Sequence, residues 1–215
     1  MSERDYVAKN RDGWTQTNAE YTDGAAEQAW SDRPFTWGVF GVPEEELGVL
    51  GDVAGLDVVE LGCGTAYFAA RLARLGARPV GIDVTPAQLD TARRMQEQTG
   101  LRFPLIEANA EDVPLPDAAF DLAVSEYGAS LWCDPYLWIP EAHRLLRPGG
   151  RLVFLTNSPL NILCAIEEPD STSETFSVRS AASIGSTGWT AVSSSISGTG
   201  TCSRCSARAV SPSRR

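Results

Sequence analysis

Apolar positions between residues 56 and 156 follow two alternating patterns. Five short apolar runs are typical of buried strands, and three longer stretches carry a helical stripe or helix-ending residues. The runs are 56–61, 79–84, 103–108, 120–127 and 151–156, and the helical stretches are 66–76, 85–100 and 138–150. Strands that are separated by helices pair in parallel through right-handed crossovers. The pattern therefore predicts an α/β fold with a doubly wound, Rossmann-like, mostly parallel sheet.

The stretch 85–100 has the clearest helix boundaries. Thr85 stands at the N-cap position, Pro86 at the first helical position and Gln88 three residues after the cap, which together predict a capping box. Gly100 is a typical helix-ending residue. We therefore expect this helix to begin directly after the second strand.

The flanking segments differ from this core. Residues 1–52 are rich in polar and aromatic side chains and are expected to form a helical, aromatic N-terminal cap, while residues 53–169 hold the Rossmann-like domain. The aromatic residues of the cap suit either a lid over a ligand or packing against the sheet. Residues 170–215 are rich in Ser and Gly and follow neither pattern, which is typical of a disordered low-complexity tail.

Polar residues and glycines collect where the expected strands end. Gly62 and Gly64 follow the first strand and permit a tight turn, so that backbone N–H groups can approach a ligand closely. Asp83 ends the second strand, where a carboxylate can accept hydrogen bonds from both ribose hydroxyls of an adenosine. Simpler interpretations stay open: the glycines also suit an ordinary strand-to-helix turn, and Asp83 also suits a partner for the N-terminal dipole of the next helix.

Four segments occur in an order and spacing that resemble those of the class I S-adenosylmethionine-dependent methyltransferases, in their small-molecule branch. The segments are VELGCGTA, GIDV, EANAEDVPLPDAAFDLAV and LLRPGGRLVF, between residues 56 and 156. The resemblance implies S-adenosylmethionine as cofactor, with S-adenosylhomocysteine as product. It also implies a sheet of seven strands, of which five are recognisable and the last two have no counterpart in the pattern of the chain. One departure is Ala66, which stands where the family most often has a third glycine.

Roles for individual residues follow from this resemblance. Asp83 would bind the ribose, Val84 would lie against the adenine, and Ala110 and Glu111 would lie beside the adenine amino group. Tyr21 is added as the favoured contact from the N-terminal segment. The full set of expected cofactor-binding residues is Glu60, Gly62, Cys63, Gly64, Asp83, Val84, Ala110, Glu111, Ser125 and Tyr21.

The implied reaction is transfer of a methyl group to a small-molecule acceptor by in-line displacement, in which positioning supplies most of the acceleration. No catalytic residue is assigned. Glu126 ends the fourth strand and is better placed as an acid or base than His143, which falls in a helix away from the strand ends. A metal site is not expected, since Cys202 and Cys205 form a single C-x-x-C pair without further ligands nearby.

The composition narrows the choice of partner and compartment. The formal net charge of −10 argues against a nucleic-acid backbone or an anionic membrane as the main partner, so a small molecule is expected. No apolar run approaches ~20 residues, and no membrane span is therefore expected. The N-terminus has no apolar signal segment and the five Cys are scattered, which together favour the cytoplasm.

Alternatives to an active methyltransferase stay open. The composition of residues 170–215 fits a reading-frame shift after about residues 161–170 as well as a natural disordered tail. A shifted or truncated chain would bind the cofactor without catalysis, or serve as a non-enzymatic binding module. A nicotinamide-dependent oxidoreductase is disfavoured, because Tyr67 stands at the last position of the G-x-G-x-x-G fingerprint.

Overall fold

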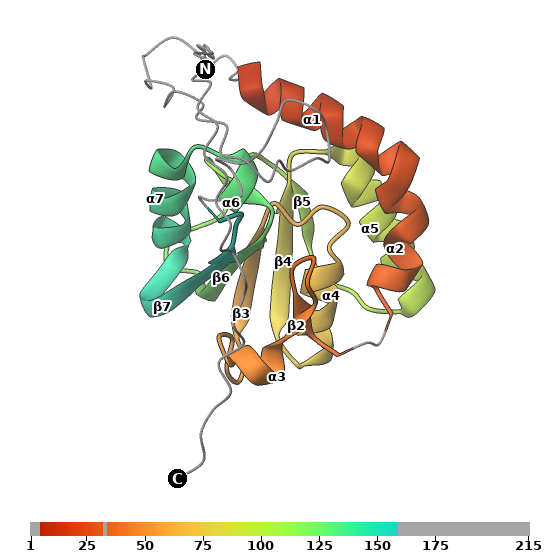
Figure 1. Ribbon diagram of the computed structural model, residues 1–215. Coiled ribbons are helices and arrows are strands. Elements are labelled where there is room, and N and C mark those ends of the chain that lie inside the picture. The colour runs from red at the N-terminus through yellow and green to blue at the C-terminus, as the bar shows by residue number, and fades with distance from the viewer. Residues whose placement is uncertain (1–4, 32–33, 159–215) are drawn as a thin grey trace, which may run out of the picture. The chain divides into compact units, whose positions relative to one another are not determined.

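Five parallel strands form the central sheet of the computed structural model, which describes residues 5–31 and 34–158 (Figure 1). The strands are β3 (Asp57–Leu61), β4 (Arg78–Asp83), β5 (Leu105–Glu107), β6 (Phe120–Glu126) and β7 (Leu146–Leu155). Their order is β5-β4-β3-β6-β7, and all neighbouring pairs are parallel. This confirms the expected doubly wound, Rossmann-like sheet. The two family strands expected to be missing and the tail 170–215 fall outside the described residues.

Helices cover both faces of this sheet. Side chains alternate between the faces along each strand, so Val58 and Val59 of β3 enter different cores. Val59 packs in the cluster that holds Trp138, and Val58 packs in the cluster that holds Phe68. Full burial of one such large apolar side chain contributes about 1.5–3 kcal/mol, so these clusters fix α7 on one face and α4 on the other. The helices are α4 (Tyr67–Arg74), α5 (Pro86–Thr99), α6 (Ala129–Trp132) and α7 (Pro135–Leu145).

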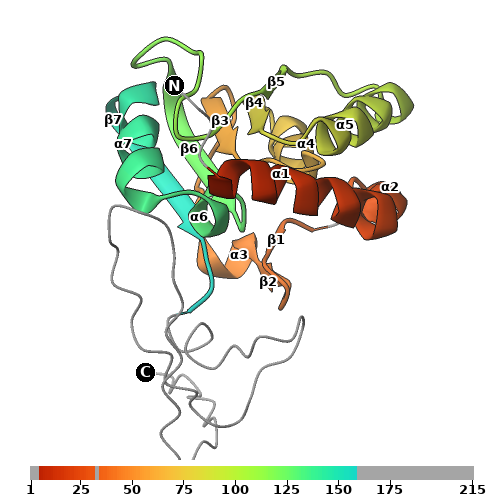
Figure 2. The ribbon, with the colours of Figure 1, turned by 90° about the horizontal axis from the view of Figure 1, so that it is seen from above.

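The segment before the sheet is mainly helical. Its elements are α1 (Asp5–Thr17), the π-helical turn η1 (Asn18–Thr22), α2 (Asp23–Ala29), β1 (Thr36–Trp37), β2 (Val42–Pro43) and α3 (Glu44–Leu47). Figure 2 shows α1 running between α6 and α2. The Nδ2 of Asn18 donates to the Oγ1 of Thr91 at 3.1 Å, which attaches η1 to α5. Residues 1–156 form one compact unit that includes this segment.

The start of α5 differs from the prediction in one respect. The helix begins at Pro86, but the side chain of Thr85 makes no capping hydrogen bond. The Oε1 of Gln88 instead accepts a hydrogen bond from the Oγ1 of Thr22 at 3.2 Å. The predicted capping box is therefore wrong, because packing of η1 against α5 gives Gln88 another partner.

The last helix is displaced toward the N-terminus relative to the predicted range 138–150. The Oδ1 of Asp134 accepts a hydrogen bond from the N–H of Tyr136 at 2.9 Å, which caps the helix and starts it at Pro135. The helix ends at Leu145, because β7 already begins at Leu146 and pairs there with β6.

The loops that follow β3 and β6 touch through their backbones. Gly62 has a φ of +75°, and a Cβ built on it would lie 2.5 Å from the N of Ala129 and 2.7 Å from the Cα of Gly128. A Cβ on Gly128 would in turn overlap the carbonyl oxygen of Gly62. Both positions therefore need glycine, since only a residue without Cβ permits this approach.

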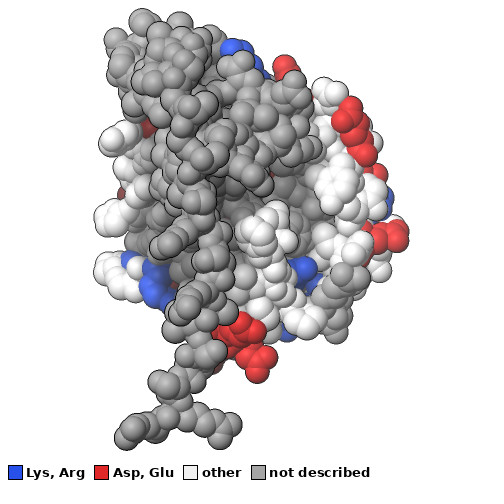
Figure 3. All heavy atoms as spheres, viewed as in Figure 1, with Lys and Arg blue, Asp and Glu red and all other residues white. Residues whose placement is uncertain are grey.

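Acidic side chains gather on the surface at α3, where Glu44, Glu45 and Glu46 follow one another (Figure 3). This patch accords with the acidic composition of the chain. Within 5–31 and 34–158, every helix is too short or too polar to cross a membrane.

Candidate functional site

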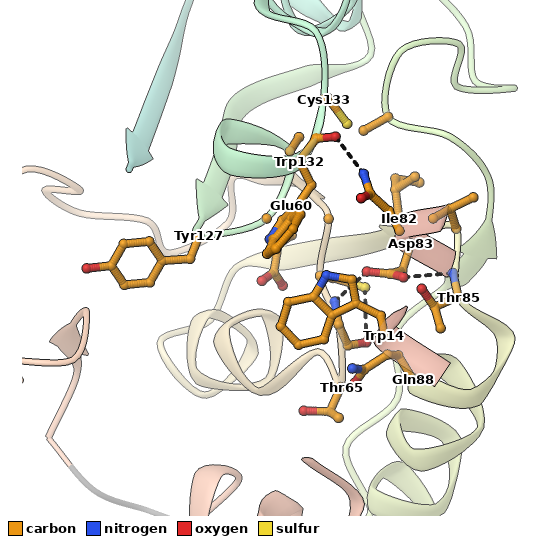
Figure 4. Close-up of a pocket in the computed structure, with 18 of the residues that line it drawn as sticks. Trp14, Glu60, Thr65, Ile82, Asp83, Thr85, Gln88, Tyr127, Trp132 and Cys133 are labelled. Carbon is orange, nitrogen blue, oxygen red and sulfur yellow. Dashed lines mark hydrogen bonds between the residues drawn. The ribbon is translucent and has the colours of Figure 1, made fainter. Parts of the chain in front are cut away.

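A cavity of about 400 Å³ opens at the carboxyl edge of the sheet (Figure 4). The loop after β3 and the ends of β4 and β6 line one side, and α1 and η1 line another. The volume falls within the ~300–1,000 Å³ that is typical of small-molecule sites. The lining includes eight of the ten expected cofactor-binding residues, namely Glu60, Gly62, Cys63, Gly64, Asp83, Val84, Ala110 and Tyr21.

The glycine turn after β3 is fixed to β4 by backbone hydrogen bonds. The N–H groups of Gly62 and Cys63 both donate to the carbonyl of Ile82, at 2.9 and 2.8 Å. Gly64 follows with a φ of +53° and Ala66 with a φ of +56°. This left-handed conformation costs a non-glycine residue roughly 1–2 kcal/mol, a cost that Ala66 bears at the position where a third glycine was expected. The turn therefore presents bare backbone to the cavity at Gly62 and Gly64.

Asp83 ends β4 and is held by two backbone donors. Its Oδ2 accepts a hydrogen bond from the N–H of Gly64 at 2.7 Å, and its Oδ1 accepts one from the N–H of Thr85 at 2.8 Å. Burial raises the pKa of this carboxyl, although the hydrogen bonds oppose the shift. The bond to Thr85 lies at the N-terminus of α5, as the helix-dipole interpretation requires. Each oxygen keeps further acceptor capacity for a ligand, so the two interpretations of Asp83 are compatible.

Glu60 is a buried carboxyl at the centre of the site. Its side chain is almost fully buried, and its Oε2 accepts a hydrogen bond from the N–H of Ala69 at 2.9 Å. Burial raises the pKa of Glu60 well above its ordinary value, and the negative charges of Glu126 and Asp83 raise it further. A cation bound beside Glu60 would therefore favour loss of its proton.

Two of the expected cofactor-binding residues are not part of the cavity lining. Ser125 is fully buried, and its hydroxyl donates to the carbonyl of Leu61 at 2.8 Å, which ties β6 to β3. The Oε1 of Glu111 accepts a hydrogen bond from the N–H of Asp134 at 2.8 Å, which supports the start of α7. The structure thus gives both side chains partners within the protein.

The N-terminal segment forms one side of the cavity. The sequence predicted an aromatic cap there but left open whether its side chains cover a ligand or pack against the sheet. The Nδ2 of Asn10 donates to the carbonyl of Trp132 at 2.9 Å. The rings of Trp14 and Trp132 meet edge-on over the cavity, with centroids 5.5 Å apart (Figure 4). Trp30 and Trp37 are instead buried in packing clusters. The aromatic residues therefore divide between the two roles that the sequence left open.

Further lining residues were not assigned to the site from the sequence. They are Val7, Asn10, Thr22, Val39, Thr65, Tyr67, Ile82, Thr85, Gln88, Ala108, Gly128, Ala129 and Cys133. A signal existed for Thr65, which follows Gly64 in the glycine turn, and for Gln88, because the first turn of a helix that follows the second strand lies at the same sheet edge as Asp83. Val7, Asn10, Thr22 and Val39 come from the segment before the sheet and reach the cavity through packing between distant segments.

The two candidate acids or bases, Glu126 and His143, lie in different parts of the structure. Glu126 lines the cavity, whereas His143 lies exposed on α7 away from it. Within the described ranges, no group of three or more His, Cys, Asp or Glu side chains could hold a metal ion. Cys202 and Cys205 fall outside those ranges.

A parallel sheet with this strand order, a glycine turn after its first strand and a carboxylate at the end of the next defines a nucleotide-binding α/β domain. Residues 59–154 match the family described as methyltransferase domain. This part of the chain is therefore similar to a methyltransferase domain, and it shares its fold with a solved S-adenosylmethionine-dependent methyltransferase.

Several known methyltransferases are similar to this chain over roughly half of its length. A malonyl-[acyl-carrier protein] O-methyltransferase of Serratia marcescens is 37% identical over 116 residues, which cover 54% of this chain and 44% of the relative. A demethylmenaquinone methyltransferase of Thermus thermophilus is 38% identical over 104 residues, which cover 47% of each. The crystal structure of an S-adenosylmethionine-dependent methyltransferase from Mesorhizobium loti is 31% identical, with a TM-score of 0.51 over 59% of each chain. The chain spans about half the length of the curated relatives it matches.

Proposed function

We propose that this chain binds S-adenosylmethionine in the cavity and transfers its methyl group to a small-molecule acceptor. The observation that carries the proposal is the joint position of Gly62, Gly64 and Asp83 on one cavity, within a domain of the methyltransferase family. The acceptors named for the relatives differ from one another, so the family alone does not select one.

The residues present fit the parts of this cofactor. Asp83 offers carboxylate oxygens to the ribose hydroxyls, and Val84 and Ala110 offer apolar surface to the adenine. Gly64 leaves space for the methionine part, because a Cβ there would meet only the Oε1 of Gln88, at 3.8 Å. Gly62 lets the loop after β6 approach and so fixes the shape of this part of the cavity. The bound cofactor would supply a methyl group activated on a sulfonium, and carboxylates and aromatic faces attract that positive charge.

The contribution of the chain to the transfer is mainly positional. In-line displacement needs the nucleophilic atom of the acceptor roughly 3–3.5 Å from the methyl carbon. One cavity that takes both ligands achieves this by holding them next to each other. Trp14 and Trp132 border that cavity, so they also limit the orientations that an acceptor can take.

Calorimetric titration with S-adenosylhomocysteine tests the cofactor site. We expect micromolar binding by the wild type. Asp83→Ala should bind at least about tenfold more weakly, since a hydrogen bond to a charged group contributes ~1.5–3 kcal/mol. Asp90→Ala is the matched control, because Asp90 lies exposed on α5 outside the cavity lining. Circular dichroism establishes that both variants are folded, and equal affinity in all three proteins would contradict the proposed site.

Release of S-adenosylhomocysteine in the presence of candidate acceptors then tests catalysis. A chain that binds the product but never turns over would be the non-catalytic binding protein that the sequence left open. A folded chain that does not bind S-adenosylhomocysteine would overturn the proposed function itself.

A further inference from the structure

The cavity is acidic, and one of its carboxylates lies apart from the expected adenosine contacts. Glu60, Asp83 and Glu126 line it, and none of the described lining residues is Lys, Arg or His. Glu60 and Asp83 lie on β3 and β4 next to the glycine turn, whereas Glu126 ends β6. The strand order β4-β3-β6 places Asp83 on one side of Glu60 and Glu126 on the other. Glu126 therefore belongs to the end of the cavity that the expected adenosine contacts leave free.

Glu126 is oriented by two donors from different segments. The N–H of Gly38 donates to its Oε1 at 2.9 Å, and the hydroxyl of Tyr67 donates to its Oε2. Burial and, after it, the charge of Glu126 raise the pKa of Tyr67 above its ordinary value, so Tyr67 stays protonated and acts as a donor. These bonds fix the carboxylate without neutralising it. Each of its oxygens keeps acceptor capacity for a ligand.

Aromatic rings accompany this carboxylate. Tyr67 and Tyr127 both line the cavity, and Tyr67 contacts Glu126 through its hydroxyl. Tyr127 has a φ of +53°, an uncommon conformation for a residue other than glycine, and its N–H donates to the carbonyl of Leu155 at 3.1 Å. An aromatic face attracts an organic cation by about 0.5–2 kcal/mol, so rings and carboxylate together favour a cationic group.

We propose that the acceptor is a small amine whose nitrogen binds beside Glu126, an inference that rests on the proposed methyltransferase function. An amine that binds as its ammonium first loses one N–H proton to water, and the lone pair so freed forms the N–C bond while the C–S electron pair stays on sulfur. The positive charge thereby moves from sulfur to nitrogen, beside the carboxylate of Glu126. A carboxylate beside the nitrogen stabilises this charge as it develops. The same carboxylate would oppose ionisation of a phenol and would repel an acidic acceptor.

Binding to protein saturated with S-adenosylhomocysteine tests this assignment. The probes are two matched trios: benzylamine, benzyl alcohol and phenylacetate, and butylamine, butanol and butyrate. In at least one trio the amine should bind about tenfold or more tightly than its two counterparts, and Glu126→Gln should remove that preference. Glu45→Gln makes the same change of charge at an exposed residue outside the cavity lining, so it should keep the preference.

Two results would overturn the proposal. The first is the lack of any preference for the amine in both trios, including the case in which no probe binds. The second is an equal effect of Glu126→Gln on both ligands, in which the affinity for S-adenosylhomocysteine falls as much as the affinity for the amine. Glu126 would then bind the ammonium group of the methionine part of the cofactor. Failure of the proposed function is seen separately, as wild-type protein that does not bind S-adenosylhomocysteine.

Discussion

Replacement of Gly62 by alanine should destabilise the fold and abolish cofactor binding. The φ of +75° at this residue costs alanine about 1–2 kcal/mol. The new Cβ would also lie 2.5 Å from the N of Ala129, and overpacking that forces backbone to move costs about 1–3 kcal/mol more. The expected loss of about 2–5 kcal/mol is a large part of the ~5–15 kcal/mol that stabilises a typical domain.

Gly100 offers a matched control for the conformational part of this cost. It has the same φ of +75°, but a Cβ built there meets no atom within 4 Å. Gly100→Ala should therefore lower the free energy of unfolding only by the cost of the left-handed φ. Urea unfolding measures the difference: with a slope of ~2 kcal/mol per molar urea, an extra ~2 kcal/mol lowers the midpoint of Gly62→Ala by a further ~1 M. Gly100→Ala should still bind S-adenosylhomocysteine, and Gly62→Ala should not.

Equal losses of unfolding free energy in the two variants would refute this reasoning, because the close contact between the loops after β3 and β6 would then contribute nothing. Normal affinity of Gly62→Ala for S-adenosylhomocysteine would refute the second part, namely that displacement of the loops after β3 and β6 disrupts the ligand site.

Two further substitutions test the electrostatics and the helix capping. The raised pKa of Glu60 means that its contribution to stability is fully present below its ordinary value of 4.5 and is lost as the pH rises toward the folded-state value. The free energy of unfolding, measured with urea at several pH values in this range, should fall more steeply with pH for the wild type than for Glu60→Gln. Parallel pH dependences in the two proteins would contradict the raised pKa of Glu60. Asp134→Ala removes the capping bond to Tyr136 and should cost about 1 kcal/mol, measured against Asp90→Ala; a loss no larger than that of this control would exclude the cap.

The sheet was predictable because its signal is local. Buried parallel strands are continuous apolar runs, and the runs at 56–61 and 120–127 correspond closely to β3 and β6. The two edge strands were predicted less closely: β5 is shorter than its predicted range 103–108, and β7 begins five residues before its predicted range 151–156. The last helix was predicted less well, because Asp134 caps it before the predicted start and β7 already begins at Leu146. The cap of α5 was missed because the partner of Gln88 comes from η1, which is distant in sequence.

The candidate site was predictable in part for the same reason. Gly62 and Asp83 were found because their chemistry follows from their place at strand ends. Asn10 could not be found this way, since its place in the cavity depends on how α1 packs. Ser125 has the right place in sequence, but its side chain is buried, and its hydroxyl donates to the carbonyl of Leu61 instead of lining the cavity. Position along a strand predicts which residues lie at the edge of the sheet, whereas the partners of their side chains depend on how other segments pack there.

The contact between Gly62 and Gly128 also limits how acceptor choice can change in the course of evolution. Neither residue can gain a side chain without displacing the backbone of the other. The paths of the two loops are therefore inherited together, and variation is left to the side chains that flank the contact, such as Glu126 and Tyr127. Descendants of this chain could exchange those side chains for a new acceptor while the loop proposed to receive the methyl donor keeps its shape.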